Sequence, residues 1–169
     1  MRKGQLFSGD IAIATFVFLS SMALAMFMWN STTEDINHAE QLRNMQKISF
    51  EAVEQLVRTE GTPEDWNYFT VEVPGLSSED RFINRTKALA FMELMDSNSS
   101  NYDDNKHLVS IDPYEFYMNV TYLDDDAVEI SGEAFVAGRM PTGETETIAI
   151  VRTAIFNSTI IRLNFIVWR

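Results

Sequence analysis

The sequence predicts an α+β protein in which one long N-terminal helix precedes a small domain with short helices and an antiparallel β-sheet. Residues 11–29 form an uncharged apolar run of nineteen residues, after which apolar residues recur every three or four positions as far as Leu56. From residue 114 onward, alternating segments typical of strands are separated by turn signals. We therefore divide the chain into a basic leader (1–4), a transmembrane and stalk helix (5–60) and an extracellular domain (61–169).

The apolar run from Ile11 to Trp29 has the length of a membrane-spanning helix, since a bilayer core of about 30 Å needs roughly 20 apolar residues. Large apolar side chains occur all around it, without the polar stripe of a helix at a soluble surface. The alternatives are a buried core helix and a secretory signal cut after Ala25. The acid Asp10 before the run and the apolar residues 26–29 beyond that cut favour a retained span.

The basic residues next to this run, Arg2 and Lys3, precede it. Because positively charged flanks stay in the cytoplasm, we expect the domain after residue 60 to lie outside the cell membrane.

The leader Arg2-Lys3-Gly4-Gln5, followed by Ser8, Asp10 and an unbroken apolar helix, resembles an archaeal type IV prepilin with a class III signal peptide. The resemblance implies that a prepilin peptidase cuts between Gly4 and Gln5 and that the helix is retained. It also implies assembly with copies of the chain, or with related pilins, into a surface filament.

Asp10 is the expected assembly residue of this helix. An ammonium group buried among apolar helices is costly unless an opposite charge lies beside it. The carboxylate of Asp10 can supply that charge to the free amine of Gln5 in a neighbouring subunit. Members of the resembled family commonly carry the acid at the fifth mature position, whereas Asp10 would be the sixth.

The composition argues against several classes of function. The formal net charge is −12, which argues against a nucleic-acid partner. There are two histidines, His38 and His107, no cysteine, and no phosphate-binding or zinc-binding motif. The acidic runs 103–105 and 124–126 lack the spacing of a calcium loop and are interpreted as solvated turns. We expect no enzymatic activity, cofactor or metal.

Candidate glycosylation sites are suggested by five Asn-x-Ser/Thr sequences, although the same residues also populate caps and turns. The asparagines are Asn30, Asn84, Asn98, Asn119 and Asn157. Asn98, in a polar loop, is the preferred acceptor.

The pattern predicts the remaining elements in order. Gly61 should cap the long helix, and Pro63 follows it. A strand is expected over 67–73, and a helix start at Ser77. Further helices are expected over 81–96, with Asn84 as a possible restart, and over 103–109. Four strands are predicted over 114–123, 127–131 with a possible extension to 137, 146–156 and 159–168.

Two functions remain open from the sequence. The first is a structural subunit, a major or minor pilin, of a type IV pilus-like surface filament that is anchored and assembled through its helix. The alternative is a membrane-anchored extracellular binding or adhesion protein that never polymerises. The mature N-terminus distinguishes them: Gln5 indicates the pilin route, Met1 a plain anchor and Met26 a secreted domain.

Overall fold

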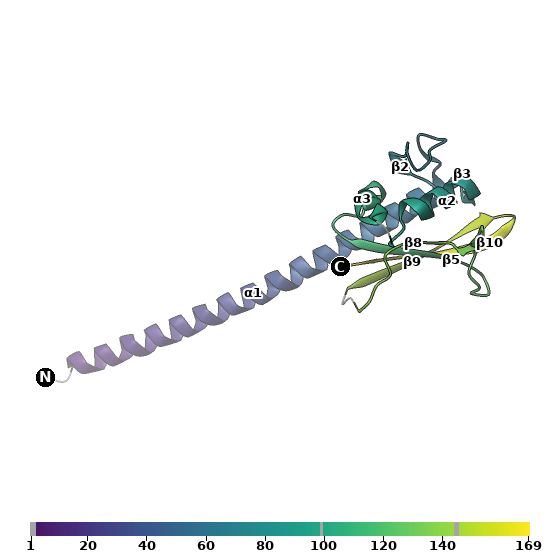
Figure 1. The fold of residues 1–169 in the computed structure, drawn as a ribbon. Coiled ribbons are helices and arrows are strands. Elements are labelled where there is room, and N and C mark those ends of the chain that lie inside the picture. The colour runs from purple at the N-terminus through teal and green to yellow at the C-terminus, as the bar shows by residue number, and fades with distance from the viewer. Residues whose placement is uncertain (1–2, 99, 144–145) are drawn as a thin grey trace. The chain divides into compact units, whose positions relative to one another are not determined.

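The computed structural model describes residues 3–98, 100–143 and 146–169, with side chains from Gly9 onward. The fold is α+β: a long N-terminal apolar helix is followed by a small domain with short helices and a largely antiparallel sheet (Figure 1). The chain divides into two compact units, residues 1–43 and 44–169. Helix α1 (Lys3–Arg58) contributes to both units, and its ends differ by two residues from the predicted 5–60.

The second unit is built on a six-stranded sheet. Its strands are β3 (Ser77–Glu79), β4 (Phe82–Ile83), β5 (Glu115–Tyr122), β8 (Val136–Gly138), β9 (Thr147–Phe156) and β10 (Thr159–Trp168). Their order is β3-β4-β9-β10-β5-β8, and every neighbouring pair is antiparallel except β4 with β9. The predicted strands over 114–123, 146–156 and 159–168 are confirmed as β5, β9 and β10.

The hairpin of β9 and β10 forms the middle of the sheet. Its two strands pair in register from Thr147↔Trp168 to Thr159↔Phe156. The turn residues Asn157 and Ser158 have φ values of 49° and 65°, the left-handed conformation that a two-residue hairpin turn requires. Asparagine tolerates this conformation better than most residues do, so the turn predicted at this position is confirmed.

One face of the sheet is covered by helices. The last turns of α1, with α2 (Arg85–Leu94) and α3 (Asn101–Asn105), lie on the same side of it (Figure 1). Alternate residues of β10 face these helices and are fully buried: Ile161, Leu163, Phe165 and Val167. The covering face of α1 is formed by residues spaced three and four apart, namely Met45, Ser49, Ala52, Val53, Leu56 and Val57. This spacing confirms the helical pattern predicted for the segment.

Aromatic rings fill the centre of the domain. The Phe116 ring stacks on Phe165 with centroids 5.2 Å apart, and it contacts the rings of Tyr102 and Phe91 at 5.6 and 6.5 Å. The Tyr102 hydroxyl accepts a hydrogen bond from the Phe116 amide, 3.0 Å away. Burial raises the pKa of the Tyr102 phenol well above its usual range, so this group is neutral in the folded core.

The predicted cap at Gly61 is wrong. α1 ends at Arg58, and Gly61 instead opens the short strand β1 (Gly61–Thr62), which pairs with β2 (Val73–Pro74). The last carbonyls of the helix are satisfied by a later segment: the amides of Leu76, Ser77 and Arg81 donate to Leu56, Thr59 and Val57. A helix end buried in a domain needs such partners, and tertiary contacts supply them here without a glycine cap.

The strand predicted over 67–73 is also wrong, since only Val73 belongs to a strand. The Asn67 side chain accepts a hydrogen bond from the Phe69 amide, and the Asn67 carbonyl accepts from the amides of Thr70 and Val71. These local bonds compete with a sheet ladder and hold the segment in turns. Phe69 is consequently 91% exposed.

The helix start predicted at Ser77 is wrong as well. Ser77 lies in β3, and its hydroxyl donates to the Val57 carbonyl instead of capping a helix. The helix begins only at Arg85, because the Asn84 side chain accepts from the amides of Thr86 and Lys87. The restart predicted at Asn84 is therefore confirmed. The predicted helix over 103–109 corresponds to α3 and the 3-10 turn η1 (Lys106–Val109).

The predicted strand from 127 toward 137 is divided into three short ones. They are β6 (Glu129–Ile130), β7 (Glu133–Ala134) and β8, and β6 pairs with β7 around a tight turn. The turn residues Ser131 and Gly132 both have positive φ, at 60° and 89°. This turn reverses the chain after Ile130, which a strand continuous from 127 to 137 would not allow.

Lys87 is a buried charge that ties three segments together. Its ammonium group donates to the carbonyls of Glu60 and Ser77, at 2.8 and 3.0 Å, and lies 3.9 Å from the Glu60 carboxylate. The two carbonyls belong to the segment after α1 and to β3. Removal of the amine would take a charged donor from both carbonyls, and the Glu60 carbonyl would keep only its hydrogen bond from the Trp66 indole at 3.0 Å.

We expect Lys87→Met to lower the free energy of unfolding by about 2–4 kcal/mol, because buried acceptors lose a charged donor. Chemical denaturation of the full chain in detergent micelles measures the change. The matched control is Lys47→Met, whose side chain is 71% exposed and forms only a surface pair with Glu51; it should shift stability by at most about 0.5 kcal/mol. Equal effects of the two substitutions would contradict the claim that Lys87 stabilises the fold through its buried hydrogen bonds.

Candidate functional site

The candidate site lies on the N-terminal part of α1, within the first unit. Among the described residues, α1 is a helix long and apolar enough to cross a membrane. Its most apolar stretch of 18 residues has a mean hydropathy of 2.2, and no residue of that stretch is buried. Side chains on all sides of the helix are exposed, for example Ile11 at 55%, Phe16 at 72% and Trp29 at 74%. Such a surface is compatible with membrane anchoring.

The predicted processing residues, Gly4 and Gln5, belong to the first turns of α1, which begins at Lys3. Their side chains lie outside the described residues. Asp10 is exposed on the helix immediately before the apolar run. All three predicted residues therefore lie near the N-terminal end of α1.

The helix continues through the polar sequence 30–35 without a break, and this sequence contains neither glycine nor proline. Apolar residues of this part remain exposed in the first unit, including Ile36 at 53%. The equivalent stripe further along, from Met45 to Val57, is buried inside the second unit. One helix thus carries an uncovered apolar surface at one end and a packed core face at the other.

At its packed end, α1 is fastened to the sheet by charge. Glu54 forms an ion pair with Arg152 of β9, with 2.5 Å between Oε1 and Nε, and about a quarter of each side chain is exposed. The Arg152 guanidinium also lies 4.6 Å from the centre of the Phe50 ring, within the range of a cation–π contact. These contacts fix the rotation of the last turns of α1 on the sheet.

The five candidate glycosylation sites differ in their surroundings. Asn30, Asn98 and Asn157 are exposed, on α1, in the loop after α2 and at the β9–β10 turn. Asn84 is occupied as the cap of α2, and its side-chain oxygen accepts two backbone amides. Asn119 lies inside β5, half-buried and paired with both Asn164 and Val136.

The residues considered for catalysis or metal binding are not brought together. His38 and His107 are both exposed and lie in different units. In the acidic runs, Asp103 is paired with Arg139 at 3.1 Å and Asp125 with Arg162. Within the described parts of the chain, there is no group of three or more histidine and acidic side chains placed to hold a metal ion.

Comparisons with known proteins do not identify a relative. No protein-family model matches the chain, and neither the curated proteins nor the solved structures contain a match. Two features of the structure were missed from the sequence, the buried Lys87 and a groove beside β8. Lys87 lies at a helical position one turn from Phe91, and only the tertiary fold places it against the end of α1.

Proposed function

We propose that the chain is a structural subunit of a type IV pilus-like surface filament, anchored in the membrane before assembly and bundled with its copies afterwards. The observation that supports this most is the continuity of α1. A single helix carries a nineteen-residue apolar run with every side chain exposed and also supplies a buried face of the folded domain. A helix of this kind can exchange lipid for the helices of neighbouring subunits while the domain stays folded.

Cleavage of the leader would allow the helix to be released from the membrane. In the proposal, a membrane peptidase cuts the Gly4–Gln5 bond, which removes Arg2 and Lys3 and leaves a free amine on Gln5. The mature net charge is then −14, because two positive charges are lost from −12. Without its basic anchor the helix can leave the bilayer, and the new amine can pair with Asp10 of the next subunit.

An open filament follows from this geometry because the two groups lie at different positions of the chain. A contact between different surfaces repeats without closing unless its rotation happens to form a ring. Each subunit contributes one amine and one carboxylate, so each added copy presents both groups again. Partners are therefore the membrane, the peptidase and further copies or related pilins.

The experiment is electron microscopy of surface filaments from archaeal cells that express a tagged copy of the chain. We expect labelled filaments from the wild type and none from Gly4→Val, because the larger side chain before the cut should block removal of the leader. Membrane-bound protein that forms no filament in either case would instead support the plain anchor with a binding domain.

Glycosylation is proposed at exposed Asn98, the preferred acceptor, and at the exposed turn of the β9–β10 hairpin, which allows a comparison with an asparagine inside a strand. Asn157 projects from a two-residue turn, whereas Asn119 lies in a central strand with neighbours on both sides. In cells that glycosylate exported proteins, we expect Asn157→Gln to lower the mass of the purified protein by one glycan. Asn119→Gln is the matched control and should leave the mass unchanged apart from the substitution. A loss of glycan mass from Asn119→Gln but not from Asn157→Gln would show that the sites are modified before the sheet forms.

A further inference from the structure

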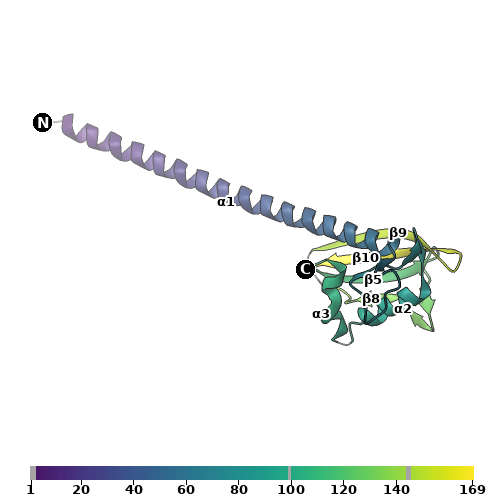
Figure 2. The ribbon, with the colours of Figure 1, turned by 90° about the horizontal axis from the view of Figure 1, so that it is seen from above.

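The two edges of the six-stranded sheet are built differently. At one edge, β3 has only three residues, carries a register shift, ends in the charged residue Glu79 and is followed by Asp80 in the turn to β4. Short, irregular and charged edges prevent pairing with another chain. At the other edge, β8 beside β5 (Figure 2) also has only three residues, but the segment from Ala134, the last residue of β7, to Gly138 carries no charge and no proline. No register shift interrupts the pairing of β8 with β5. This second edge therefore lacks the charges and the register shift that protect the first.

Along the edge from Ala134 to Gly138, the backbone amide and carbonyl groups point outward at alternate residues. The Phe135 amide donates to the Val128 carbonyl at 2.7 Å, and the Phe135 carbonyl accepts from the Val120 amide at 3.0 Å. Since neighbouring residues of a strand direct their backbone groups to opposite sides, those of Ala134 and Val136 face away from the sheet. The outward amide of Gly138 donates to the Met95 carbonyl at 2.9 Å, which closes one end of this row.

A groove runs along the same edge, between α2 with its following loop and the strands β7 and β8. Its volume is about 720 Å³. Leu89 and Met92 of α2 form one wall, both half-buried, while Ala134 and Val136 form the other. The groove therefore combines apolar walls with a row of outward backbone groups, the two features by which an added strand is bound.

The charge of the groove is negative. Among the described residues that line it, Glu93, Asp96 and Glu133 are acidic and none is lysine, arginine or histidine. Glu93 and Glu133 are exposed at its rim, one on each wall. A segment that binds in the groove must therefore carry positive charge itself or bind together with cations from solution.

We propose that this groove binds an extended segment of a second protein by strand addition, and that the segment alternates apolar with lysine or arginine residues. Its backbone pairs with Ala134 and Val136, its apolar side chains contact Leu89 and Met92, and its basic side chains meet Glu93 and Glu133. A second copy of this chain fits less well, since the chain has a net charge of −12 and exposes the acidic residues Glu64, Asp65 and Glu72, which the groove would repel. The inference concerns the domain alone and does not depend on polymerisation.

The test uses the full chain in detergent micelles and two synthetic peptides of about eight residues, a common strand length. In the first peptide lysine alternates with valine, and in the second glutamate replaces lysine. We expect the lysine peptide to bind and the glutamate peptide to bind at least about tenfold more weakly, because like charges replace attractive pairs. Isothermal titration calorimetry measures both affinities.

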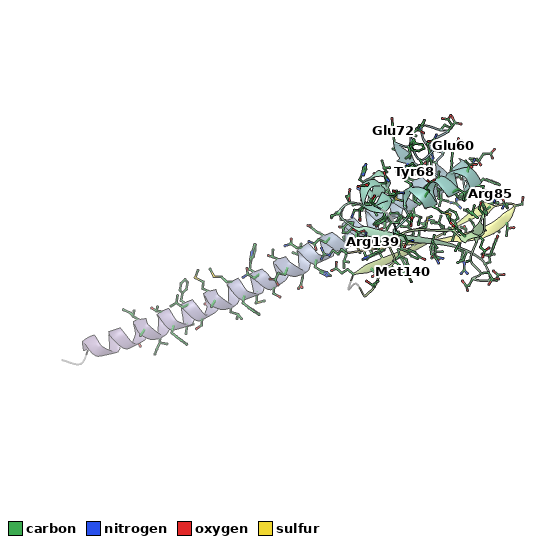
Figure 3. All side chains as sticks on the ribbon, viewed as in Figure 1. Glu60, Tyr68, Glu72, Arg85, Arg139 and Met140 are labelled. Atoms are coloured by element: carbon green, nitrogen blue, oxygen red, sulfur yellow. The ribbon has the colours of Figure 1, made fainter. Side chains whose placement is uncertain are left out.

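Two variants and one control connect binding to the groove. Val136→Pro removes an outward amide without touching the ladder to β5, and it should abolish binding of the lysine peptide. The double change Glu93→Lys with Glu133→Lys should weaken it about tenfold. Glu72→Lys is the matched control, because Figure 3 shows Glu72 on the loop far from Arg139 and Met140, which follow β8. This variant should bind the lysine peptide with the affinity of the wild type.

Several outcomes would overturn the proposal. Equal affinities for the two peptides would remove the charge argument, and unchanged binding by a folded Val136→Pro variant would remove strand addition. Self-association that Val136→Pro abolishes would show that the occupant is a second copy. If Val136→Pro fails to fold by circular dichroism, the double charge reversal decides, and full binding by that variant would count against the groove.

Discussion

Asp10→Ala should abolish surface filaments while leaving membrane insertion and the folded domain intact. The carboxylate lies at the edge of the apolar run in the first unit, and the domain core is formed by residues of the second unit. An unpaired acid costs about 2.5 kcal/mol or more at the centre of a membrane helix and less at its edge, where Asp10 lies, so its removal should not impair insertion. In the proposed bundle, however, the substitution leaves the amine of Gln5 buried without a counter-charge.

The measurement is electron microscopy of sheared surface material at equal expression, with the membrane fraction analysed in parallel. Asp35→Ala is the matched control, because Asp35 is an exposed acid on the same helix beyond the apolar run. It should assemble normally. Filaments from Asp10→Ala in wild-type amounts would exclude the charge pair, and loss of the protein from the membrane would show that Asp10 acts in insertion.

Leu163→Asp should unfold the second unit. Leu163 is fully buried in β10, where it lies between Val120 of β5 and Arg152 of β9. A carboxylate at this position would be buried, and the neighbouring cation, Arg152, is already paired with Glu54. The cost is about 5 kcal/mol or more, which is comparable to the whole stability of a small domain. We therefore expect loss of cooperative unfolding and no fixed tertiary packing.

Near-ultraviolet circular dichroism and tryptophan fluorescence of the full chain in micelles report this change, because Trp66 and Trp168 are each 3% exposed in the folded domain. Asn164→Asp is the matched control, since residue 164 is half-buried on the opposite face of the same strand. It should cost at most about 1 kcal/mol. A Leu163→Asp variant with the wild-type denaturation midpoint would show that this face of the sheet is not the core.

The elements predicted correctly are those whose signals are local. The apolar run and the helical spacing to Leu56 predict α1, and Asn157-Ser158 between two alternating segments predicts the hairpin of β9 and β10. Asn84 predicts the start of α2 because its cap depends only on the next three residues. In each case, the residues that determine the structure are neighbours in the sequence.

The elements predicted incorrectly depend on distant partners or on competing local bonds. The end of α1 is satisfied by the amides of residues 76–81, so Gly61 is not needed as a cap. The parallel pairing of Phe82 with Ile155 joins segments more than seventy residues apart and leaves no local pattern. At 67–73 the alternation of apolar residues is real, yet Asn67 turns the backbone before a strand can form.

The candidate site shows the same contrast. Gly4, Gln5 and Asp10 are predicted from the sequence because a leader would be a linear signal, and all three positions belong to the N-terminal end of α1. The groove beside β8 could not be found in this way. It exists only because the turn at Ser131-Gly132 turns the chain back so that β8 becomes a sheet edge, beside which α2 packs.

The central claim is that the chain is processed as a pilin, and the mature N-terminus tests it most directly. Intact-mass and N-terminal peptide mass spectrometry of membrane-fraction protein from archaeal cells should show a chain that begins at Gln5. The same measurement on Gly4→Val should show the leader still attached. A wild-type protein that begins at Met1 or at Met26 would contradict the account, as would a Gly4→Val protein that begins at Gln5.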